Sequence, residues 1–140
     1  MTVPQALIKL AHSEFRSKFK LSDEDRLYVE ERGMLAIRLF AEERIREKLA
    51  PAHPIRDGFQ TPLSGHPVFK AQHATATCCR NCLHNWWCVR KGIPLSELQQ
   101  DKIVNLIMAW IEAMMGLGIT DSSVNGIAVE LPPSAFWTRE

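Results

Sequence analysis

The stretch Ser96-Glu-Leu-Gln-Gln-Asp-Lys-Ile-Val-Asn-Leu-Ile-Met-Ala-Trp-Ile-Glu-Ala-Met114 decides the fold class, because it carries the clearest helical signal in the chain. Ser96 and Gln99 have the spacing of a capping box, in which each side chain bonds the backbone N–H of the other residue. Gly116 follows the last periodic residue, where glycine commonly ends a helix. We therefore predict a helix between Ser96 and Gly116, with one apolar face in the core: Ile103, Leu106, Ile107, Trp110, Ile111 and Met114.

The chain before this helix is predicted to form shorter helices. Ser22 can cap one of them, since the acidic residues 23–25 lie favourably against the helix dipole, and this helix can pause at Gly33. Over residues 34–49, apolar side chains again recur at helical spacing. Residues 50–65 instead form a loop rich in proline and glycine, which is long for a compact domain. This loop becomes a candidate lid if the site described below is catalytic.

Length and composition fit one domain. A chain of 140 residues with 46% hydrophobic and 24% charged side chains is ordinary for a soluble globular protein, and its net charge of +1 names no partner. We predict an all-α fold, a small single-domain helical bundle with a His/Cys-rich loop–helix segment. Within this domain, 1–140, we expect an N-terminal helical arm (1–21), a helical core (22–115) and a C-terminal tail (116–140), in which residues 126–131 can form a short strand.

All four cysteines lie within eleven residues: Cys78, Cys79, Cys82 and Cys88. A disulfide framework would spread its cysteines along the chain, and the first twelve residues lack the charged and apolar regions of a signal peptide. The longest charge-free apolar stretch of the last helix, residues 103–111, is about half the length that a membrane span needs. We therefore expect a cytoplasmic protein with no membrane partner, whose reduced, closely spaced thiols point to a metal.

The segment after the loop combines cysteines and histidines in metal-binding spacing. Cys79 and Cys82 form a C-x-x-C pair, and Cys78 lies four residues before Cys82 as an alternative partner. His66 and His73 are seven residues apart, which stacks them on one side of a short helix. Adjacent cysteines on a helix point about 100° apart, so we do not expect both in one site. We predict a site for a transition metal, zinc before any other, with ligands drawn from His66, His73, Cys79 and Cys82 and with Cys78 as the substitute.

A thiol- or metal-dependent enzyme acting at Cys78 or Cys79 is the first alternative. Thr77 is positioned to cap a helix from Cys78 to about Arg90, and a helix N-terminus favours the thiolate over the thiol. Arg80 adds positive charge beside the same thiols. We therefore expect at least one cysteine to be partly ionised near neutral pH. If only three protein ligands hold the metal, water fills the fourth position and hydrolytic chemistry becomes accessible.

An iron–sulfur cluster is the alternative cofactor. Cys79, Cys82 and Cys88 have tight spacing, and Cys78 or His73 would supply the fourth ligand. Adjacent cysteines serve one cubane poorly, and a helix from Cys78 would direct Cys88 elsewhere. Zinc is therefore the better prediction.

A nucleic-acid-binding module is the second alternative. No acidic residue lies between Asp57 and Glu97, and the cations of this stretch flank a pair of tryptophans, which suits phosphate contacts and base stacking. Four positive charges are few for such a module, so it ranks below the metal site. Its binding residues would be Arg80, Arg90, Lys91 and Trp86.

Three short stretches resemble a known family: His-Pro-Val-Phe at 66–69, Ala-Gln-His-Ala-Thr-Ala-Thr-Cys-Cys-Arg at 71–80 and Cys-Leu at 82–83. Through them the chain resembles a small bacterial family known as a domain of unknown function, over about residues 15–111. The resemblance implies a small, mostly helical bacterial protein and brings no activity with it. In that family a histidine often follows the position of Trp86, where this chain has other residues. The resemblance therefore favours these ligand candidates: His66, His73, Cys78, Cys79 and Cys82.

Overall fold

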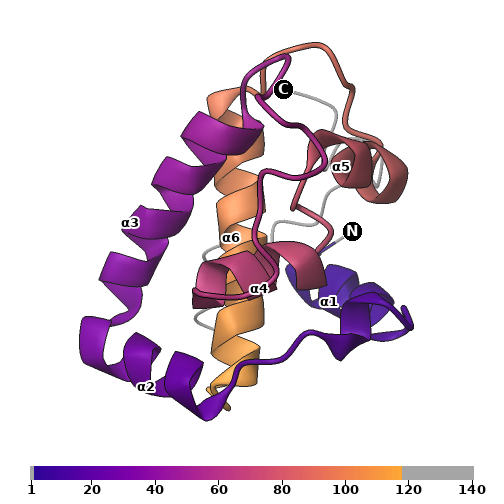
Figure 1. Cartoon of the computed structure of the whole chain (residues 1–140). Helices are drawn as coiled ribbons and strands as arrows, with labels where there is room; N and C mark the ends of the chain where they lie inside the picture. The colour runs from indigo at the N-terminus through magenta and orange to yellow at the C-terminus, as the bar shows by residue number, and fades with distance from the viewer. Residues whose placement is uncertain (1, 118–140) are drawn as a thin grey trace.

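The computed structural model describes residues 2–117, which form six α-helices (Figure 1). They are α1 (Val3–Ala11), α2 (Asp23–Arg32), α3 (Met34–Arg44), α4 (Pro67–Ala74), α5 (Arg80–Trp87) and α6 (Glu97–Met114). A 3-10 turn, η1 (Arg16–Lys18), follows α1, and a π-helical turn, η2 (Ile45–Leu49), continues α3. Residues 2–117 contain no β-strand, which confirms the predicted all-α fold. The strand predicted at 126–131 lies outside the described residues.

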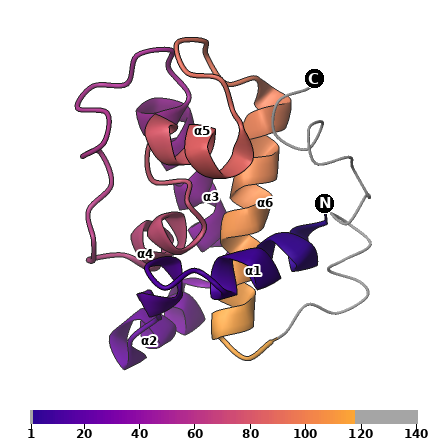
Figure 2. The ribbon, with the colours of Figure 1, turned by 90° about the vertical axis from the view of Figure 1, so that its right-hand side faces the viewer.

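Helix α6 is the central element of the fold. It begins with the predicted capping box, because Ser96 Oγ accepts a hydrogen bond from the N–H of Gln99 and Gln99 Oε1 accepts one from the N–H of Ser96, both at 3.0 Å. In both views α6 runs the length of the molecule, with α1, α3 and α4 packed against it (Figures 1 and 2). None of the helices described is both long and apolar enough to cross a bilayer. Met114 is half-buried, and the other predicted core residues of α6 are buried: Ile103, Leu106, Ile107, Trp110 and Ile111.

Helices α2 and α3 meet at Gly33. Ser22 caps α2 as predicted, and Gly33 ends it with φ 84°, a backbone conformation that favours glycine. The long helix predicted over residues 34–49 is α-helical only in its first part. In η2 the N–H of Ala50 bonds the carbonyl of Ile45 at 2.8 Å, which is the wider spacing of a π-helix.

The loop of residues 50–65 is irregular, as predicted, and is fixed to the start of α5. Thr61 Oγ1 donates to the carbonyl oxygen of Cys78 at 2.8 Å. Asp57 Oδ1 accepts a hydrogen bond from the N–H of Arg80 at 3.1 Å. The loop therefore packs against the segment that carries the cysteines.

Candidate metal centre

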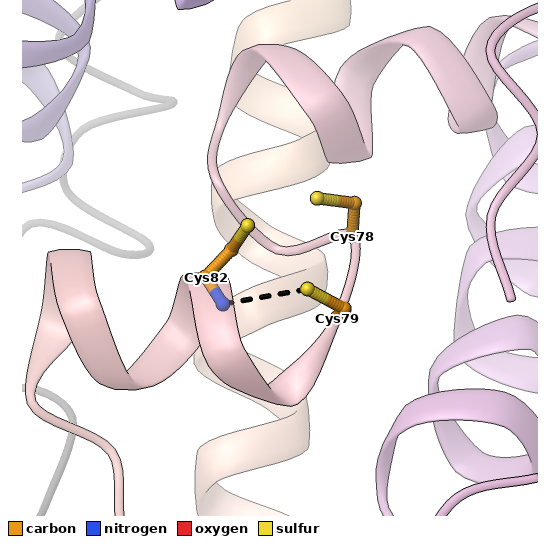
Figure 3. Close-up of side chains that lie close together, drawn as sticks. All are labelled: Cys78, Cys79 and Cys82. Atoms are coloured by element: carbon orange, nitrogen blue, oxygen red, sulfur yellow. Dashed lines mark hydrogen bonds between the residues drawn. The ribbon is translucent and has the colours of Figure 1, made fainter. Parts of the chain in front are cut away.

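Three cysteine side chains converge where the link after α4 enters α5 (Figure 3). The Sγ atoms of Cys78, Cys79 and Cys82 all lie within 4.8 Å of one another. Cys78 and Cys79 are buried, each with 6% of its surface exposed, and Cys82 is half-buried. Three sulfurs at this separation can hold a metal ion, and residues 2–117 contain no other such group of His, Cys, Asp or Glu. We call these three residues the cysteine group.

Cys79 is the N-cap of α5, and its conformation allows both adjacent cysteines to join the group. Its backbone is extended, with φ −157° and ψ 167°, and its Sγ accepts a hydrogen bond from the N–H of Cys82 at 3.4 Å. The prediction that Thr77 caps a helix starting at Cys78 is therefore wrong. Because Cys79 precedes the helix, the divergence of about 100° expected for helical neighbours does not apply.

The threonine hydroxyls of the link close the end of α4 instead of capping α5. Thr75 Oγ1 donates to the carbonyl oxygen of Ala71 at 2.7 Å. Thr77 Oγ1 lies 2.9 Å from Thr75 Oγ1 and 3.5 Å from the carbonyl oxygen of Gln72. Both threonines are fully buried. Cys79, two residues after Thr77, therefore caps α5 instead.

Arg16 of η1 brings a cation to the sulfurs. Its Nη2 lies 3.1 Å from Cys82 Sγ, and its Nη1 lies 3.7 Å from Cys78 Sγ and 2.8 Å from the carbonyl oxygen of His73. Arg16 is only 8% exposed, and within residues 2–117 it has no carboxylate partner. Sequence reasoning missed this residue, since it lies 66 positions before Cys82 in an ordinary basic stretch. A buried cation is stable when it is paired, so Arg16 favours thiolate at these sulfurs.

The three thiols differ in proton affinity. Hydrogen bonds from Cys78 and Cys79, together with the contact to Arg16, lower the pKa of Cys82. Hydrogen bonding to the other two sulfurs, with burial, raises the pKa of Cys78. For Cys79, a hydrogen bond from Cys78 lowers the pKa, but its interaction with Cys82 and its burial outweigh this and raise it. Of the three thiols, Cys82 is therefore the one whose surroundings favour the thiolate, whereas the thiol enzyme considered from the sequence was placed at Cys78 or Cys79.

Arg80 has no role at the thiols, contrary to the prediction. It is 2% exposed, so it cannot reach a phosphate, and its part in the predicted nucleic-acid surface is also wrong. Of the other residues predicted for that surface, Arg90 and Lys91 are exposed and Trp86 is half-buried. The guanidinium of Arg80 donates to five backbone carbonyl oxygens, those of Leu49, Ala50, Pro51, Arg90 and Ile93.

The two predicted histidine ligands lie outside the cysteine group. His66 caps α4, with its Nδ1 accepting a hydrogen bond from the N–H of Val68 at 3.0 Å, and its ring stacks on Phe40 with 3.7 Å between the centroids. Nε2 of His73 lies 3.0 and 3.1 Å from two carbonyl oxygens of loop 50–65, which makes this nitrogen a donor. The ligand roles of His66 and His73 stay predictions.

Cys88 lies at the other end of α5. It is exposed and adopts φ 59°, a left-handed conformation that ends the helix. The helix thus ends at Trp87, before the predicted end near Arg90. The iron–sulfur spacing that included Cys88 is not assembled, because α5 separates this residue from the cysteine group.

The fold and the cysteine group define a small all-α protein with a site that can hold a metal ion. The chain belongs to the family described as a domain of unknown function (DUF4186), whose model matches residues 4–112. This match confirms the resemblance to an uncharacterised family, and it spans Arg16 and the whole cysteine group. No solved structure matches the chain.

Proposed function

We propose that the protein binds a transition metal, zinc before others, through Cys78, Cys79 and Cys82. The observation that carries the proposal is the approach of the three sulfurs to within 4.8 Å of one another. Zinc with Zn–S bonds of about 2.3 Å sets tetrahedral sulfurs about 3.8 Å apart. The cysteine group can adopt this spacing by small side-chain rotations, without a change of fold.

The charges around the group support zinc. A Zn²⁺ ion with three thiolates carries one excess negative charge, which the guanidinium of Arg16 balances. Arg16 also donates toward Cys82 Sγ at 3.1 Å and Cys78 Sγ at 3.7 Å, as outer-shell donors do toward metal-bound thiolates. A monovalent ion such as Cu⁺ would leave a further negative charge unbalanced in a buried place.

Three protein ligands leave a fourth position for water or a substrate, and hydrolytic chemistry then becomes accessible. The predicted histidine ligands are the alternative occupants. His73 is the better placed of the two, because its carbonyl oxygen shares Arg16 with the cysteine group. Its ring would have to give up its bonds to loop 50–65 to bind metal.

Elemental analysis tests the proposal directly. We expect about one zinc per chain in protein purified under reducing conditions. Cys88→Ser is the matched control and should keep its zinc, whereas the triple variant Cys78→Ser/Cys79→Ser/Cys82→Ser should contain none. A wild-type chain that holds no metal, and whose melting temperature does not change on adding zinc, would refute the proposal. An iron–sulfur cluster, the alternative cofactor, would show itself by visible absorption of the fresh protein.

Thiol chemistry at Cys82 is a second candidate function. The contact of Arg16 Nη2 with its sulfur at 3.1 Å favours the nucleophilic thiolate, and Cys82 is the half-buried member of the group. In metal-free protein at neutral pH, Cys82 should therefore react with iodoacetamide much faster than Cys78 and Cys79. Peptide mass spectrometry after short labelling measures the three rates. Equal, slow labelling of all three would exclude this candidate.

A further inference from the structure

A hollow of about 410 Å³ lies between η2 and the loop of residues 50–65, and we call it the loop hollow. Its volume is that of a small-molecule site. No residue of the cysteine group lines it, so an inference about it does not rest on the proposed metal. The lining residues that matter here are Arg44, Lys48, His53, Ile55, Arg56 and Phe59.

Cations outnumber anions around the loop hollow. Arg44, Lys48 and Arg56 line it, and Glu47 is its single acidic lining residue. Neither Lys48 nor Arg56 forms an ion pair within residues 2–117. Asp57, the neighbour of Arg56, directs one carboxylate oxygen to the first backbone N–H of α5 at 3.1 Å. The hollow therefore presents a positive field to solvent, which attracts anions.

Arg44 lines the loop hollow and carries a guanidinium that is only partly paired. Its Nη2 donates to the carbonyl oxygen of Gln60 at 2.8 Å, whereas its Nε is buried and has no hydrogen-bond partner. The guanidinium lies 4.8 Å from the centre of the Phe69 ring, which holds it in place. Burial also lowers the pKa of Arg44, an effect that nearby Glu47 opposes. An anion beside this half-buried cation would stabilise it.

Two large apolar side chains stand exposed at the same hollow. Ile55 is 86% exposed and Phe59 is 81% exposed, and both line it. Covering such side chains with an apolar surface is favourable, because it removes hydrocarbon from water. The ligand chemistry that matches the hollow is therefore an anionic head joined to an apolar or aromatic body.

The loop is organised before any ligand arrives. Gln60 Oε1 accepts a hydrogen bond from the N–H of Gly58 at 2.7 Å, and Gln60 Nε2 donates to Asp57 Oδ1 at 2.8 Å and to the carbonyl oxygen of Lys48 at 3.3 Å. Arg56 is held at φ 57°, a left-handed conformation that costs a non-glycine residue about 1 kcal/mol or more. A fixed loop lowers the entropy lost on binding.

We propose that the loop hollow binds a small organic anion, whose carboxylate or phosphate is held by Arg44, Lys48 and Arg56 and whose apolar body lies on Phe59 and Ile55. The contacts are those of a binding site and require no reaction.

The test uses the full chain and the probe 8-anilinonaphthalene-1-sulfonate, which joins an anionic sulfonate to aromatic rings. Its fluorescence is titrated against the wild type, the double variant Lys48→Gln/Arg56→Asn and Phe59→Ser. Asparagine is chosen at position 56 because it tolerates a left-handed backbone. Lys20→Gln is the matched control, since Lys20 lines a different, more apolar hollow between α1, η1 and α6.

We expect the probe to bind at least about ten-fold more weakly to the double variant and to Phe59→Ser, and equally well to the Lys20→Gln control. Unchanged affinity in both loop variants, or a loss confined to Lys20→Gln, would overturn the proposal. A single-stranded DNA oligonucleotide forms a second arm. If it displaces the probe, and if its binding depends on Arg90 and Lys91 but not on Lys48 and Arg56, the face is a nucleic-acid surface and the proposal fails.

Discussion

Two buried arginines, Arg16 and Arg80, meet their surroundings in opposite ways. Arg80 is 2% exposed, and its guanidinium donates only to backbone carbonyl oxygens, from 2.6 Å at Ile93 to 3.5 Å at Ala50. Arg16 is 8% exposed and has one carbonyl partner, that of His73, and two sulfur partners. Of the two, only Arg16 touches groups that can change their charge.

The difference separates a cation that holds the fold together from one that acts on a site. Carbonyl dipoles replace water around Arg80, and its donors join the end of η2 to the segment after α5. A thiol sulfur is a weak acceptor, whereas a thiolate is a strong one, so Arg16 is well paired only when its sulfurs are ionised or bound to metal. Metal binding should therefore depend on Arg16 and leave Arg80 unaffected.

The largest expected effect is the loss of stability in Arg80→Met. The substitution removes the guanidinium donors to five carbonyls, of which that of Ala50 still accepts the N–H of Leu95 at 2.8 Å. We expect the free energy of unfolding to fall by about 3–5 kcal/mol. Urea denaturation of metal-free protein measures it. Arg16→Met, studied in parallel, should show a much smaller fall in the free energy of unfolding. Equal losses in the two variants would show that the two arginines do not differ in the way inferred.

Local patterns were enough to predict most of the helices. Ser22 caps α2 and the capping box at Ser96 forms, both as predicted, and Gly33 ends α2. The loop of residues 50–65 is also where its prolines and glycines placed it. These features depend on residues within a few positions of one another, so the sequence pattern contains them.

The candidate site was predictable only in part, because it depends on contacts between distant segments. Spacing indicated Cys79 and Cys82, but the inclusion of Cys78 depends on the extended cap of α5. Arg16 reaches the site through the packing of η1 against α4, which no local pattern reveals. Arg80 was wrongly placed beside the thiols because it follows Cys79 in the sequence. Its side chain instead donates to carbonyl oxygens at the end of η2.

The second prediction concerns the stability of the protein in acid. Lowering the pH leaves Arg16 and Arg80 charged but protonates His66. The pKa of His66 is lowered from 6.5 to about 4, chiefly because the ring is buried. The charges of Arg44 and Arg32 lower the pKa further, whereas that of Asp25 raises it. The unfolded chain therefore binds a proton that the folded chain rejects. Stability should be complete above about pH 6.5 and fall by roughly 3 kcal/mol as the pH drops toward 4.

Urea denaturation of metal-free protein at several pH values measures this slope. His66→Asn is the matched variant, since asparagine can also cap α4 by accepting the N–H of Val68 but does not titrate. The stability of this variant should depend much less on pH between about 6.5 and 4. A slope that persists in His66→Asn would assign the acid sensitivity to another group.

The third prediction concerns the affinity for zinc in Arg16→Met. Removing an outer-shell donor typically lowers metal affinity 10- to 100-fold, and we expect a loss of about this size here. Competition with a chromophoric chelator measures the dissociation constant. Arg16→Lys should fall between the variant and the wild type, because an ammonium keeps the charge but not the two-pronged contact with Cys78 and Cys82. Unchanged affinity in Arg16→Met would place Arg16 with Arg80 as a purely structural residue.

The smallest expected effect on stability is that of Cys79→Ser, which separates the two roles of one residue. Serine is a preferred N-cap, so its Oγ should accept the N–H of Cys82 as Cys79 Sγ does at 3.4 Å. We expect the free energy of unfolding of the metal-free protein to change by less than about 1 kcal/mol. Zinc affinity should nevertheless collapse, because a neutral hydroxyl is a poor substitute for a thiolate ligand. Denaturation and chelator competition on one preparation measure the stability and the zinc affinity. Cys88→Ser, at an exposed position, is the control and should change neither quantity. A variant that retained wild-type zinc affinity would leave Cys79 with its capping role alone and reduce the sulfur ligands to the two that Arg16 contacts.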